Sequence, residues 1–471
     1  MSNEKNGLKK TLGKWDVLAI GFGAIIGWGW LSMGGYWLSA AGSLGSCLAF
    51  AVAGVMIVFV GLAFSELASA MPKAGGVMNY TWRAFGPKVS FFAAWMLTLG
   101  YVAMTAWEGV ATVAAVDFLF PTETGAVLYT IAGQDVYLLS LVIALAAAAI
   151  MFFLAYRGID TIAKFQNASV IIMVVVVLIF AVAAVFKGSA ENLQPTFPNG
   201  FVGSVSIMLM CVLFLGGFDT IPQVAEEMDL PRKTVGKLVI TSILMAILWY
   251  FITLLATAAS LTPDELSGTT LAAGTAMNKI FGGSWAGNIL VISGILGILT
   301  SWVALYIGAT RLLFSMARVG MLPSAFAKLH PKYNTPYVAT IVVGILTFIA
   351  PFFGKKALQW LSNAGGFAIN FGFGFATLAF LVLRFKEPNM ERPYKVPCGK
   401  LVGILGVIMS FTLVIISLPG VSQFSLVWPN EAGIVIAWVL LGVILFVVSN
   451  RSGRFKQVDE NIRGIVLGDE K

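Results

Sequence analysis

Long apolar runs alternate with short polar segments along the whole chain of 471 residues. A run of about 20 apolar residues is long enough to cross a bilayer as a helix. No long hydrophilic stretch separates one run from the next, so we expect a single transmembrane domain over 1–471. The pattern predicts twelve spans, at 15–41, 44–71, 89–119, 136–156, 166–187, 200–222, 237–260, 284–317, 337–353, 358–383, 401–421 and 431–450.

The composition indicates that the bilayer is the solvent of this chain. Hydrophobic residues make up 58% of it and charged residues 11%, whereas soluble domains carry about 25% charged residues. Cys47, Cys211 and Cys398 are widely spaced, and the single histidine, His330, lies in a Lys-rich loop. We therefore expect an all-α membrane protein without disulfides, metal site or catalytic nucleophile–base set, and hence not an enzyme.

Lysine and arginine residues are distributed unevenly over the predicted loops. With twelve spans and the N-terminus inside, 26 of the 30 Lys and Arg residues fall on one side; the exceptions are Lys187, Lys279, Lys355 and Lys356. Cytoplasmic loops carry such an excess of positive charge. We expect both termini in the cytoplasm and the protein in the cytoplasmic (plasma) membrane. The net charge of +8 then reflects orientation and contact with anionic lipid, and requires no nucleic acid partner.

Glycines interrupt the first apolar run, which contains the sequence GFGAIIGWGW at residues 21–30. Each glycine destabilises a helix by about 1 kcal/mol relative to alanine. A spanning helix that is broken at mid-membrane exposes N–H and C=O groups that bind charged solutes. The alternatives are close packing against a neighbouring helix and a dinucleotide-binding loop, whose spacing and βαβ context this segment lacks.

A second cluster of helix-breaking residues occurs five spans later. Gly216 and Gly217 are followed by Asp219, Thr220 and Pro222 within the sixth predicted span. Secondary transporters place broken helices at matching positions of two inverted repeats. We therefore expect breaks in spans 1 and 6 of a five-plus-five repeat. Repeat one covers 15–187, repeat two covers 200–383, and 401–450 adds spans 11 and 12.

Four stretches of the sequence resemble motifs of the amino acid–polyamine–organocation superfamily, in the family's order. They are AIGFGAIIGWG at 19–29, GLAFSELASAMPKAGGVMNYTWRAFGP at 61–87, LFLGGFDTIPQVAEEMDLPRKTVGK at 213–237 and ATRLLFSMARVGMLPSAFAKLHPKYNTPYVA at 309–339. The resemblance covers essentially the whole chain. It implies a LeuT-like fold and a permease that moves its substrate by alternating access.

The resemblance also implies where a substrate binds. Backbone N–H groups of the first break hold the substrate carboxylate in this family; the matching residues are Ile26, Gly27, Trp28 and Gly29. Carbonyl groups where the helix halves end receive the substrate ammonium; the matching residues are Ala24, Ile25, Phe214 and Gly217. Phe218 resembles an aromatic residue that gates the site. Trp28, Trp30, Asn370 and Thr377 are further candidates for lining the pocket, although aromatic residues in spans more often serve packing.

The chain departs from some proton-coupled relatives at one position. Those relatives carry a lysine midway along span 5, where this chain has Met173. Sodium-coupled relatives use hydroxyl groups of span 8, and Thr300 with Ser301 matches that pattern; the same hydroxyls also suit helix-to-helix hydrogen bonds. We expect no bound cofactor, and either H⁺ or Na⁺ as the coupling ion.

Glu108 is a carboxyl group in the middle of a predicted span. A charged residue at that depth is costly and marks a functional site by default. Three roles are open: a proton carrier, a partner for a cationic substrate amine, or a protonated structural group. Asp219 adjoins the second break, where we expect it to cap a half-helix or to contribute to a gate.

Charged residues of the inside loops form a candidate cytoplasmic gate. Glu226, Glu227 and Asp229 precede Arg232 and Lys233, while Arg311 and Arg318 end span 8. Salt bridges among them would close the cytoplasmic side, and Glu66 and Arg83 are candidates to join. Exposed ion pairs are individually weak, so burial decides their importance.

These observations lead to an amino acid permease that moves a small zwitterion as an ion-coupled symporter or an exchanger. A carrier of polyamines or other organic amines is the alternative within transport, and would require more acidic residues facing the pocket. A non-transporting nutrient sensor is the alternative of another class; it would be expected to carry a signalling extension, and the two tails here are short. An ion channel would require a continuous polar pore lining.

Overall fold

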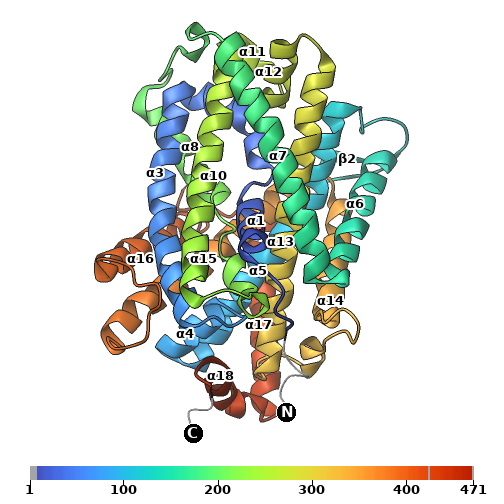
Figure 1. The fold of residues 1–471 in the computed structure, drawn as a ribbon. Helices are drawn as coiled ribbons and strands as arrows, with labels where there is room; N and C mark the ends of the chain where they lie inside the picture. The colour runs from blue at the N-terminus through green and yellow to red at the C-terminus, as the bar shows by residue number, and fades with distance from the viewer. Residues whose placement is uncertain (1–7, 423–424, 469–471) are drawn as a thin grey trace.

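The computed structural model describes residues 8–422 and 425–468, and nearly all of them lie in an upright bundle of helices (Figure 1). Within the described residues, nine helices are long and apolar enough to cross a membrane. They are α3 (Gly34–Ala70), α5 (Pro87–Leu119), α6 (Leu138–Arg157), α7 (Ile159–Lys187), α10 (Arg232–Ser260), α13 (Ser284–Arg318), α15 (Lys356–Lys386), α16 (Gly399–Ile416) and α17 (Asn430–Arg451). Two shorter apolar helices, α8 (Gly200–Phe214) and α14 (Tyr337–Ile349), accompany them.

The first predicted span is interrupted in the middle of the bundle. Helix α1 (Lys14–Ile25) ends there, residues 26–28 are not helical, and α2 (Gly29–Ser32) begins on the other side. Helix α3 contains a kink at Gly42, whose φ is 78°. A side chain at Gly42 would lie 2.5 Å from the Thr196 carbonyl oxygen, so glycine is required at this corner. The corner falls at the predicted boundary between the runs 15–41 and 44–71.

The sixth predicted span is interrupted at a corresponding place. Helix α8 ends at Phe214, residues 215–219 are irregular, and α9 (Thr220–Gln223) continues the run for one turn. Its direction then changes through a 3-10 turn at Ala225–Glu227 before α10 begins. Both predicted glycine clusters therefore coincide with observed breaks in helical structure.

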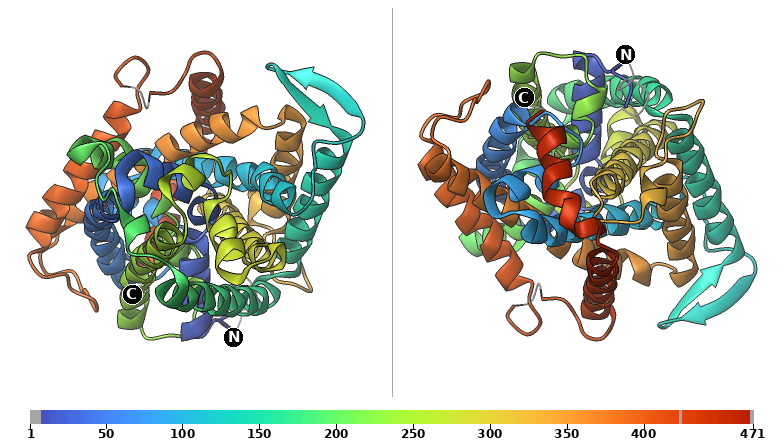
Figure 2. Two further views of the ribbon diagram at one scale, coloured as in Figure 1. Left: turned by 90° about the horizontal axis from the view of Figure 1, so that it is seen from above. Right: turned by 90° about the horizontal axis from the view of Figure 1, so that it is seen from below.

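Helices at the centre of the bundle differ from those at its periphery. Helix α5 is 83% buried over its most apolar segment, whereas α17 is only 22% buried and α6 and α7 are 28% buried. The exposed faces of the peripheral helices carry aliphatic residues such as Ile171, Val175 and Leu440. Figure 2 shows α5 and α13 enclosed by the other helices. Such apolar outer surfaces are suited to lipid, and the chain is a multi-pass membrane protein.

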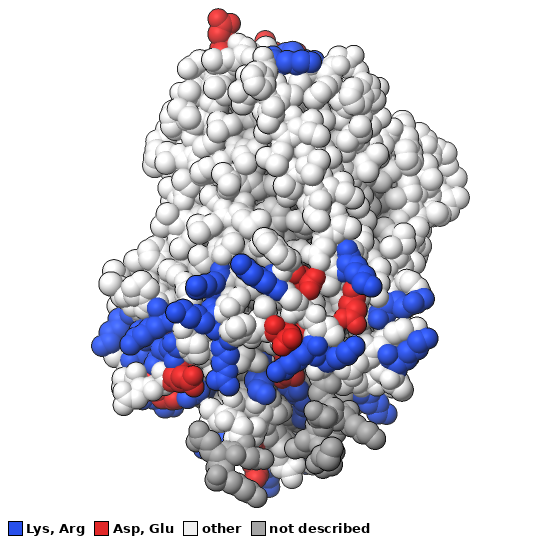
Figure 3. All heavy atoms as spheres, in the orientation of Figure 1, with Lys and Arg blue, Asp and Glu red and all other residues white. Residues whose placement is uncertain are grey.

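The two ends of the bundle carry different charge. Lysine and arginine side chains gather at the end that contains α4 (Val77–Phe85) and α18 (Val458–Val466), as Figure 3 shows. We call this end the basic face. The opposite end, the distal face, contains α11 (Pro263–Ser267) and α12 (Ala272–Phe281). Lys5 and the last residue, Lys471, which enter the charge count from the sequence, lie outside the described residues.

A β-hairpin corrects the expectation of an all-α protein. Strands β1 (Val127–Ile131) and β2 (Gln134–Tyr137) pair antiparallel between α5 and α6. The two turn residues, Ala132 and Gly133, have φ values of 50° and 73°, which suit the tight turns of two-residue hairpins. The hairpin occupies the segment between predicted spans 3 and 4. The hairpin is hard to recognise in the sequence because its two strands contain only nine residues and stand between two much longer apolar helices.

Candidate functional site

The first helix break leaves backbone groups of both polarities without partners. The Ile26 N–H still bonds the Phe22 carbonyl at 3.0 Å, and helical bonding resumes where Leu31 N–H meets the Trp28 carbonyl at 3.2 Å. Between them, the N–H groups at residues 27–29 and the carbonyls at residues 24–25 have no hydrogen-bond partner among the described residues. Free N–H groups at the start of a half-helix attract an anion, and free carbonyls at the end of one attract a cation.

The second break touches the first. Gly217 has a φ of 114°, and a Cβ atom there would lie 2.6 Å from the Ala24 carbonyl oxygen. Two carbonyls at this second break, those of Phe214 and Gly217, are already hydrogen-bonded. The Phe214 carbonyl accepts a bond from the Tyr250 hydroxyl at 3.2 Å. The Gly217 carbonyl accepts bonds from the Thr220 hydroxyl at 2.7 Å and the Thr220 N–H at 3.1 Å.

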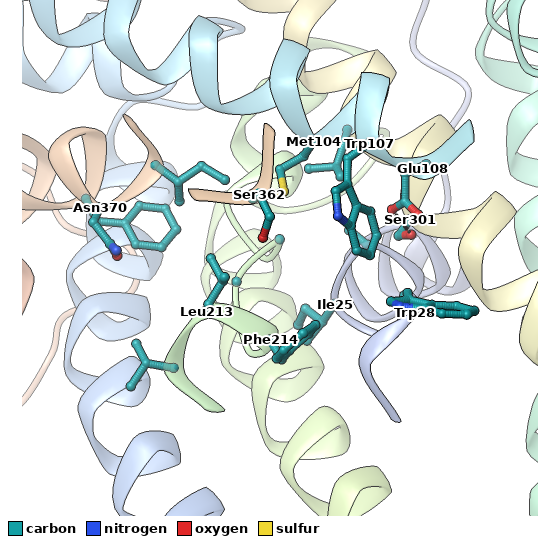
Figure 4. A pocket seen from close by; sticks show the side chains of 18 residues that line it. Ile25, Trp28, Met104, Trp107, Glu108, Leu213, Phe214, Ser301, Ser362 and Asn370 are labelled. Atoms are coloured by element: carbon teal, nitrogen blue, oxygen red, sulfur yellow. Dashed lines mark hydrogen bonds between the residues drawn. The ribbon is translucent and has the colours of Figure 1, made fainter. Parts of the chain in front are cut away.

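A cavity of about 80 Å³ lies where the two breaks meet, as Figure 4 shows. Its walls are mostly apolar and aromatic, with Trp28 and Phe214 from the breaks and Trp107 from α5. Four polar side chains reach it: Glu108, Ser301, Ser362 and Asn370. An apolar chamber with a few placed polar groups is the usual form of a small-molecule site.

Glu108 and Ser301 form one polar corner of the cavity beside the first break. The Ser301 hydroxyl lies 2.5 Å from Glu108 Oε1 and 2.9 Å from the Ile298 carbonyl. A hydroxyl has one proton, so it cannot donate to both acceptors. Both short contacts are hydrogen bonds if Glu108 is protonated: its O–H then donates to the Ser301 hydroxyl, and that hydroxyl donates to the Ile298 carbonyl. A protonated carboxyl also suits its surroundings, because Glu108 is only 3% exposed and no described Lys or Arg pairs with it.

The second carboxyl oxygen of Glu108 is buried without a hydrogen-bond partner in the described protein. A side chain at Gly27 would lie 2.8 Å from the Ser301 hydroxyl and 3.7 Å from Glu108 Oε1. The carboxyl group therefore adjoins the backbone N–H groups of the first break. Unpaired buried oxygen atoms are costly, and here the unpaired oxygen belongs to a residue that lines the cavity.

The structure brings most of the predicted site residues together. Those that line the cavity are Ala24, Ile25, Gly27, Trp28, Phe214, Gly217, Glu108, Ser301 and Asn370. Five others do not line it: Ile26, Gly29, Phe218, Trp30 and Thr377. A side chain at Gly29 would collide with the Phe214 ring at 2.3 Å, so Gly29 permits the approach of the two half-helices. Trp30 packs edge-on against Trp249, and Thr377 hydrogen-bonds to its own helix.

Thr300 also lies outside the cavity, one residue before Ser301. Its hydroxyl bonds the Gly297 carbonyl of its own helix at 2.8 Å and lies 3.4 Å from the Gly23 carbonyl of α1. Met173 packs against Gly297. The position at which some relatives carry a lysine therefore adjoins span 8 next to the first break, and here it is apolar.

Sequence reasoning missed several residues that line the cavity, above all Met104, Trp107, Leu213 and Ser362. Ser362 lies eight residues before Asn370, so both face the same side of α15, and this spacing was available in the sequence. No sequence signal distinguishes Met104 and Trp107 from the other apolar residues of α5. Only the packing of α5 against α13 and α15 turns them inward.

The side of the cavity toward the basic face is closed by buried groups. Phe218 packs edge-on against Phe64 and lies 5.2 Å, centroid to centroid, from Phe373, which lines the cavity. Next to it, Tyr101 donates a hydrogen bond of 2.6 Å to the Asp219 carboxyl. Asp219 thus joins the second break to α5 on the closed side, and its role as a gate residue stays a prediction.

Two ion pairs lie between these groups and the basic face. Arg311 and Glu227 pair at 2.9 Å with side chains 1% and 2% exposed, and Arg318 pairs with Glu226 at 2.6 Å. The predicted gate cluster thus joins the end of α13 to the segment after α9. The other predicted members take different partners. Glu66 pairs with Arg384 and Arg392, Arg83 pairs with Glu387, Arg232 lies 3.7 Å from Glu391, and Asp229 bonds Leu12 through its backbone.

The side of the cavity toward the distal face is hollow. A second cavity of about 530 Å³ shares Trp28, Trp107, Phe214 and Asn370 with the first. It continues between the half of α8 next to the second break, the distal half of α15 and the end of α16, where it is lined by Leu209, Gln359 and Leu413 among others. A solute in the central cavity is therefore separated from the distal side by far less packed protein than from the basic side.

A bundle of apolar helices in which two interrupted helices meet at a central cavity, closed toward one face of the bundle only, defines a membrane transporter rather than an enzyme. The comparisons with known proteins agree. A family model described as amino acid permease matches residues 12–448, and the chain belongs to this family.

Relatives of known activity resemble this chain over nearly its full length. The branched-chain amino acid permease BcaP of Bacillus subtilis is 29% identical over 96% of this chain and 95% of its own. A methylthioribose transporter of the same organism is 26% identical over 95% of each chain. The aspartate-proton symporter of Bacillus subtilis is 25% identical over 88% of this chain and 80% of its own. The substrates in these names differ in charge and size, so substrate choice depends on the residues of the site.

Proposed function

We propose that this protein is a secondary active transporter that moves a small neutral amino acid across the cytoplasmic membrane by alternating access. In this proposal the helices form twelve spans: a LeuT-like pair of inverted five-span repeats with breaks in spans 1 and 6, followed by α16 and α17. The family and its amino acid-transporting relatives support the substrate class. The two observed breaks support the arrangement of the repeats.

One observation carries the proposal: the contact between the two breaks, with free N–H groups at residues 27–29 and free carbonyls at Ala24 and Ile25. An amino acid presents a carboxylate and an ammonium group about one carbon atom apart. The N–H groups suit the carboxylate and the carbonyls suit the ammonium. A polyamine has no carboxylate for the N–H groups, and Glu108 is the only acidic side chain among the described residues that line the cavity.

The size of the cavity favours a small substrate. One buried water needs about 10–15 Å³ of such space, so a cavity of about 80 Å³ holds a solute with few heavy atoms. Alanine and serine are of this size. The apolar walls and the single acidic group disfavour side chains with a fixed charge.

In the proposed orientation the basic face is cytoplasmic, because cytoplasmic segments of membrane proteins carry the excess of Lys and Arg. The distal face is then outside, and the described conformation is closed toward the cytoplasm. Substrate enters from the distal hollow. Release requires the groups around Phe218 and the Arg311–Glu227 pair to separate.

The proposed coupling ion is the proton, and Glu108 is its carrier. The hydrogen bonds around Ser301 fit a protonated Glu108, and Glu108 lines the central cavity. Loss of the proton toward the cytoplasm would leave a buried charge beside the first break, which favours reorganisation of the site. Sodium held by Thr300 and Ser301 is the second candidate, favoured by the approach of Thr300 to the Gly23 carbonyl.

A thermal-shift panel on detergent-purified protein tests the proposal. It covers the twenty amino acids and several polyamines, each in sodium and in potassium. A ligand that binds only the folded protein raises the melting temperature. We expect shifts with small neutral amino acids in both salts. Shifts with diamines alone would replace the amino acid by an organic amine, and a requirement for sodium would replace the proton. Uptake of the stabilising solute into proteoliposomes would exclude a non-transporting sensor.

A further inference from the structure

A large cavity opens on the basic face, well away from the central site. Its volume is about 810 Å³, and it lies between the segment before α1, the turn after the second break, the start of α10 and the end of α18. Leu8, Met228, Val235 and Ile465 supply its apolar wall. The loop after α3, with Pro72 and Lys73, and the end of α13, with Arg318, complete the lining, so the cavity is built by segments from both halves of the chain.

Positive charge dominates the lining of this cavity. Lys10, Lys73, Arg232 and Arg318 line it, against the single carboxylate of Glu226. Glu226 is already paired with Arg318 through two hydrogen bonds of 2.6 and 2.9 Å. The side chains of Lys10 and Lys73 have no ion pair or hydrogen bond within the described part of the chain, although the Lys73 backbone bonds Met71 and Asn79. The two lysines are therefore available to a ligand.

Two further features favour an anion here. Arg232 begins α10, a helix of 29 residues, so the positive end of that helix dipole lies at the cavity, although the Thr234 N–H of its first turn already bonds the Pro231 carbonyl. The Nε atom of Arg318 is buried and has no hydrogen-bond partner among the described residues. The opposing contribution comes from the carbonyl end of the short helix α18, at Gly464–Gly468 of the lining. The charged side chains that line the cavity still carry a net positive charge, which suits a ligand group with two or more negative oxygens.

We propose that this cavity is a regulatory site for a phosphate-bearing anion. Lys10 and Lys73 hold its oxygens, with Arg232 as a third cation. Such an anion would connect the segment before α1, the loop after α3 and the start of α10. These segments surround the Glu226–Arg318 pair on the closed side of the transporter. Binding therefore stabilises the conformation that is closed toward the basic face and slows transport, because a ligand shifts a conformational equilibrium toward the state it binds.

Binding at this cavity is tested by thermal shift on the purified full-length chain at constant ionic strength, because salt screens charges nonspecifically. The probes are inorganic phosphate and, separately, nanodiscs of phosphatidylglycerol compared with phosphatidylcholine. The variants are Lys10→Gln/Lys73→Gln and, as matched control, Lys164→Gln, an exposed lysine at the same end that does not line the cavity. We expect a saturable rise in melting temperature for the wild type and the control, and none for the double variant.

Each outcome decides the proposal. A shift with phosphate assigns the site to a soluble anion, and a shift with phosphatidylglycerol alone assigns it to a lipid headgroup. An equal shift in the double variant, or no shift of the wild type with either probe, overturns the proposal. The effect on transport rests on the proposed function and is measured separately. With the effective probe on the side of the basic face, the initial uptake rate should fall in the wild type and not in the double variant.

Discussion

The two helix breaks meet at the same cavity, yet they differ in what their backbone groups bind. At the first break the N–H groups of residues 27–29 and the carbonyls of Ala24 and Ile25 are free. At the second, the carbonyls of Phe214 and Gly217 already accept hydrogen bonds from Tyr250 and Thr220. The carbonyls that end the first half-helix are thus open to a ligand, whereas the carbonyls of Phe214 and Gly217 are held by neighbouring protein groups.

This difference indicates a division of roles. The segment after Gly217 carries Asp219, Glu226 and Glu227. All three side chains bond to α5 or α13, so this segment is attached to the rest of the bundle. Gly217 contacts Ala24, whose carbonyl is free at the first break. We propose that this contact transmits occupancy of the site to the segment after the second break.

The largest expected effect comes from placing a methyl group where the breaks touch. Gly217→Ala forces a positive φ on alanine and drives its Cβ against the Ala24 carbonyl. We expect strain of about 1–3 kcal/mol and loss of nearly all uptake in proteoliposomes. Gly216→Ala is the matched control, since its Cβ would meet only the Leu213 carbonyl, at 3.2 Å. Equal losses in both variants would show that the contact between the breaks is unimportant.

Breaking the buried ion pair behind the second break should reduce transport less than Gly217→Ala does, but it should lower the stability of the protein more. Glu227→Gln leaves Arg311 charged and buried, which costs about 3–5 kcal/mol. We expect a lower melting temperature and faster alkylation of a cysteine introduced by Gln223→Cys. Glu226→Gln is the control because its pair is partly exposed, and such pairs contribute about 1 kcal/mol or less. A larger effect at Glu226 would place the main closure at the surface instead.

Replacing the carboxyl group of Glu108 should abolish the coupling of transport to protons while leaving substrate binding intact. Glu108→Gln keeps a group that can donate to Ser301 but cannot release a proton. We expect uptake to lose its stimulation by an inward proton gradient, while exchange of internal for external substrate continues. Asp117→Asn, near the distal end of the same helix, should retain the stimulation. A Glu108→Gln variant that still accumulates substrate with the gradient would remove Glu108 from coupling.

The smallest effect is expected at Thr300. Its hydroxyl bonds its own helix and lies 3.4 Å from the Gly23 carbonyl, so Thr300→Val should remove about 1 kcal/mol of interaction at most. We expect uptake to fall by less than about tenfold and to be equal in sodium and potassium. Strict dependence on sodium that disappears in this variant would assign Thr300 to a sodium site and overturn proton coupling.

Much of the architecture could be predicted from the pattern of apolar runs. The breaks at residues 26–28 and 215–219 follow from Gly27 and Gly217, because glycines weaken helices locally and independently of tertiary contacts. The hairpin at 127–137 was missed. Its short strands lie between two long apolar runs, and its turn depends on the local conformation of Ala132 and Gly133.

Only the part of the site that is formed by backbone groups of the two helix breaks could be predicted from the sequence. The residues of the two breaks lie at the cavity because they are adjacent in sequence to the glycines. Trp107 and Met104 could not be identified, because their positions depend on how α5 packs against other helices. Phe218, which resembles a gating aromatic residue in the sequence, does not line the cavity and packs between Phe64 and Phe373 behind its wall. The helix is irregular there, so sequence spacing does not determine the direction of its side chain.

Binding of a matched set of analogues tests the central claim most directly, namely that the first break binds a carboxylate. The set is the amino acid that stabilises the protein most, its amide, and the amine that lacks the carboxylate altogether, each titrated by thermal shift. We expect stabilisation by the amino acid and none by the amide or the amine, because only the carboxylate satisfies the N–H groups of residues 27–29. Equal stabilisation by the amine would contradict the account and move recognition to Glu108 and the carbonyls.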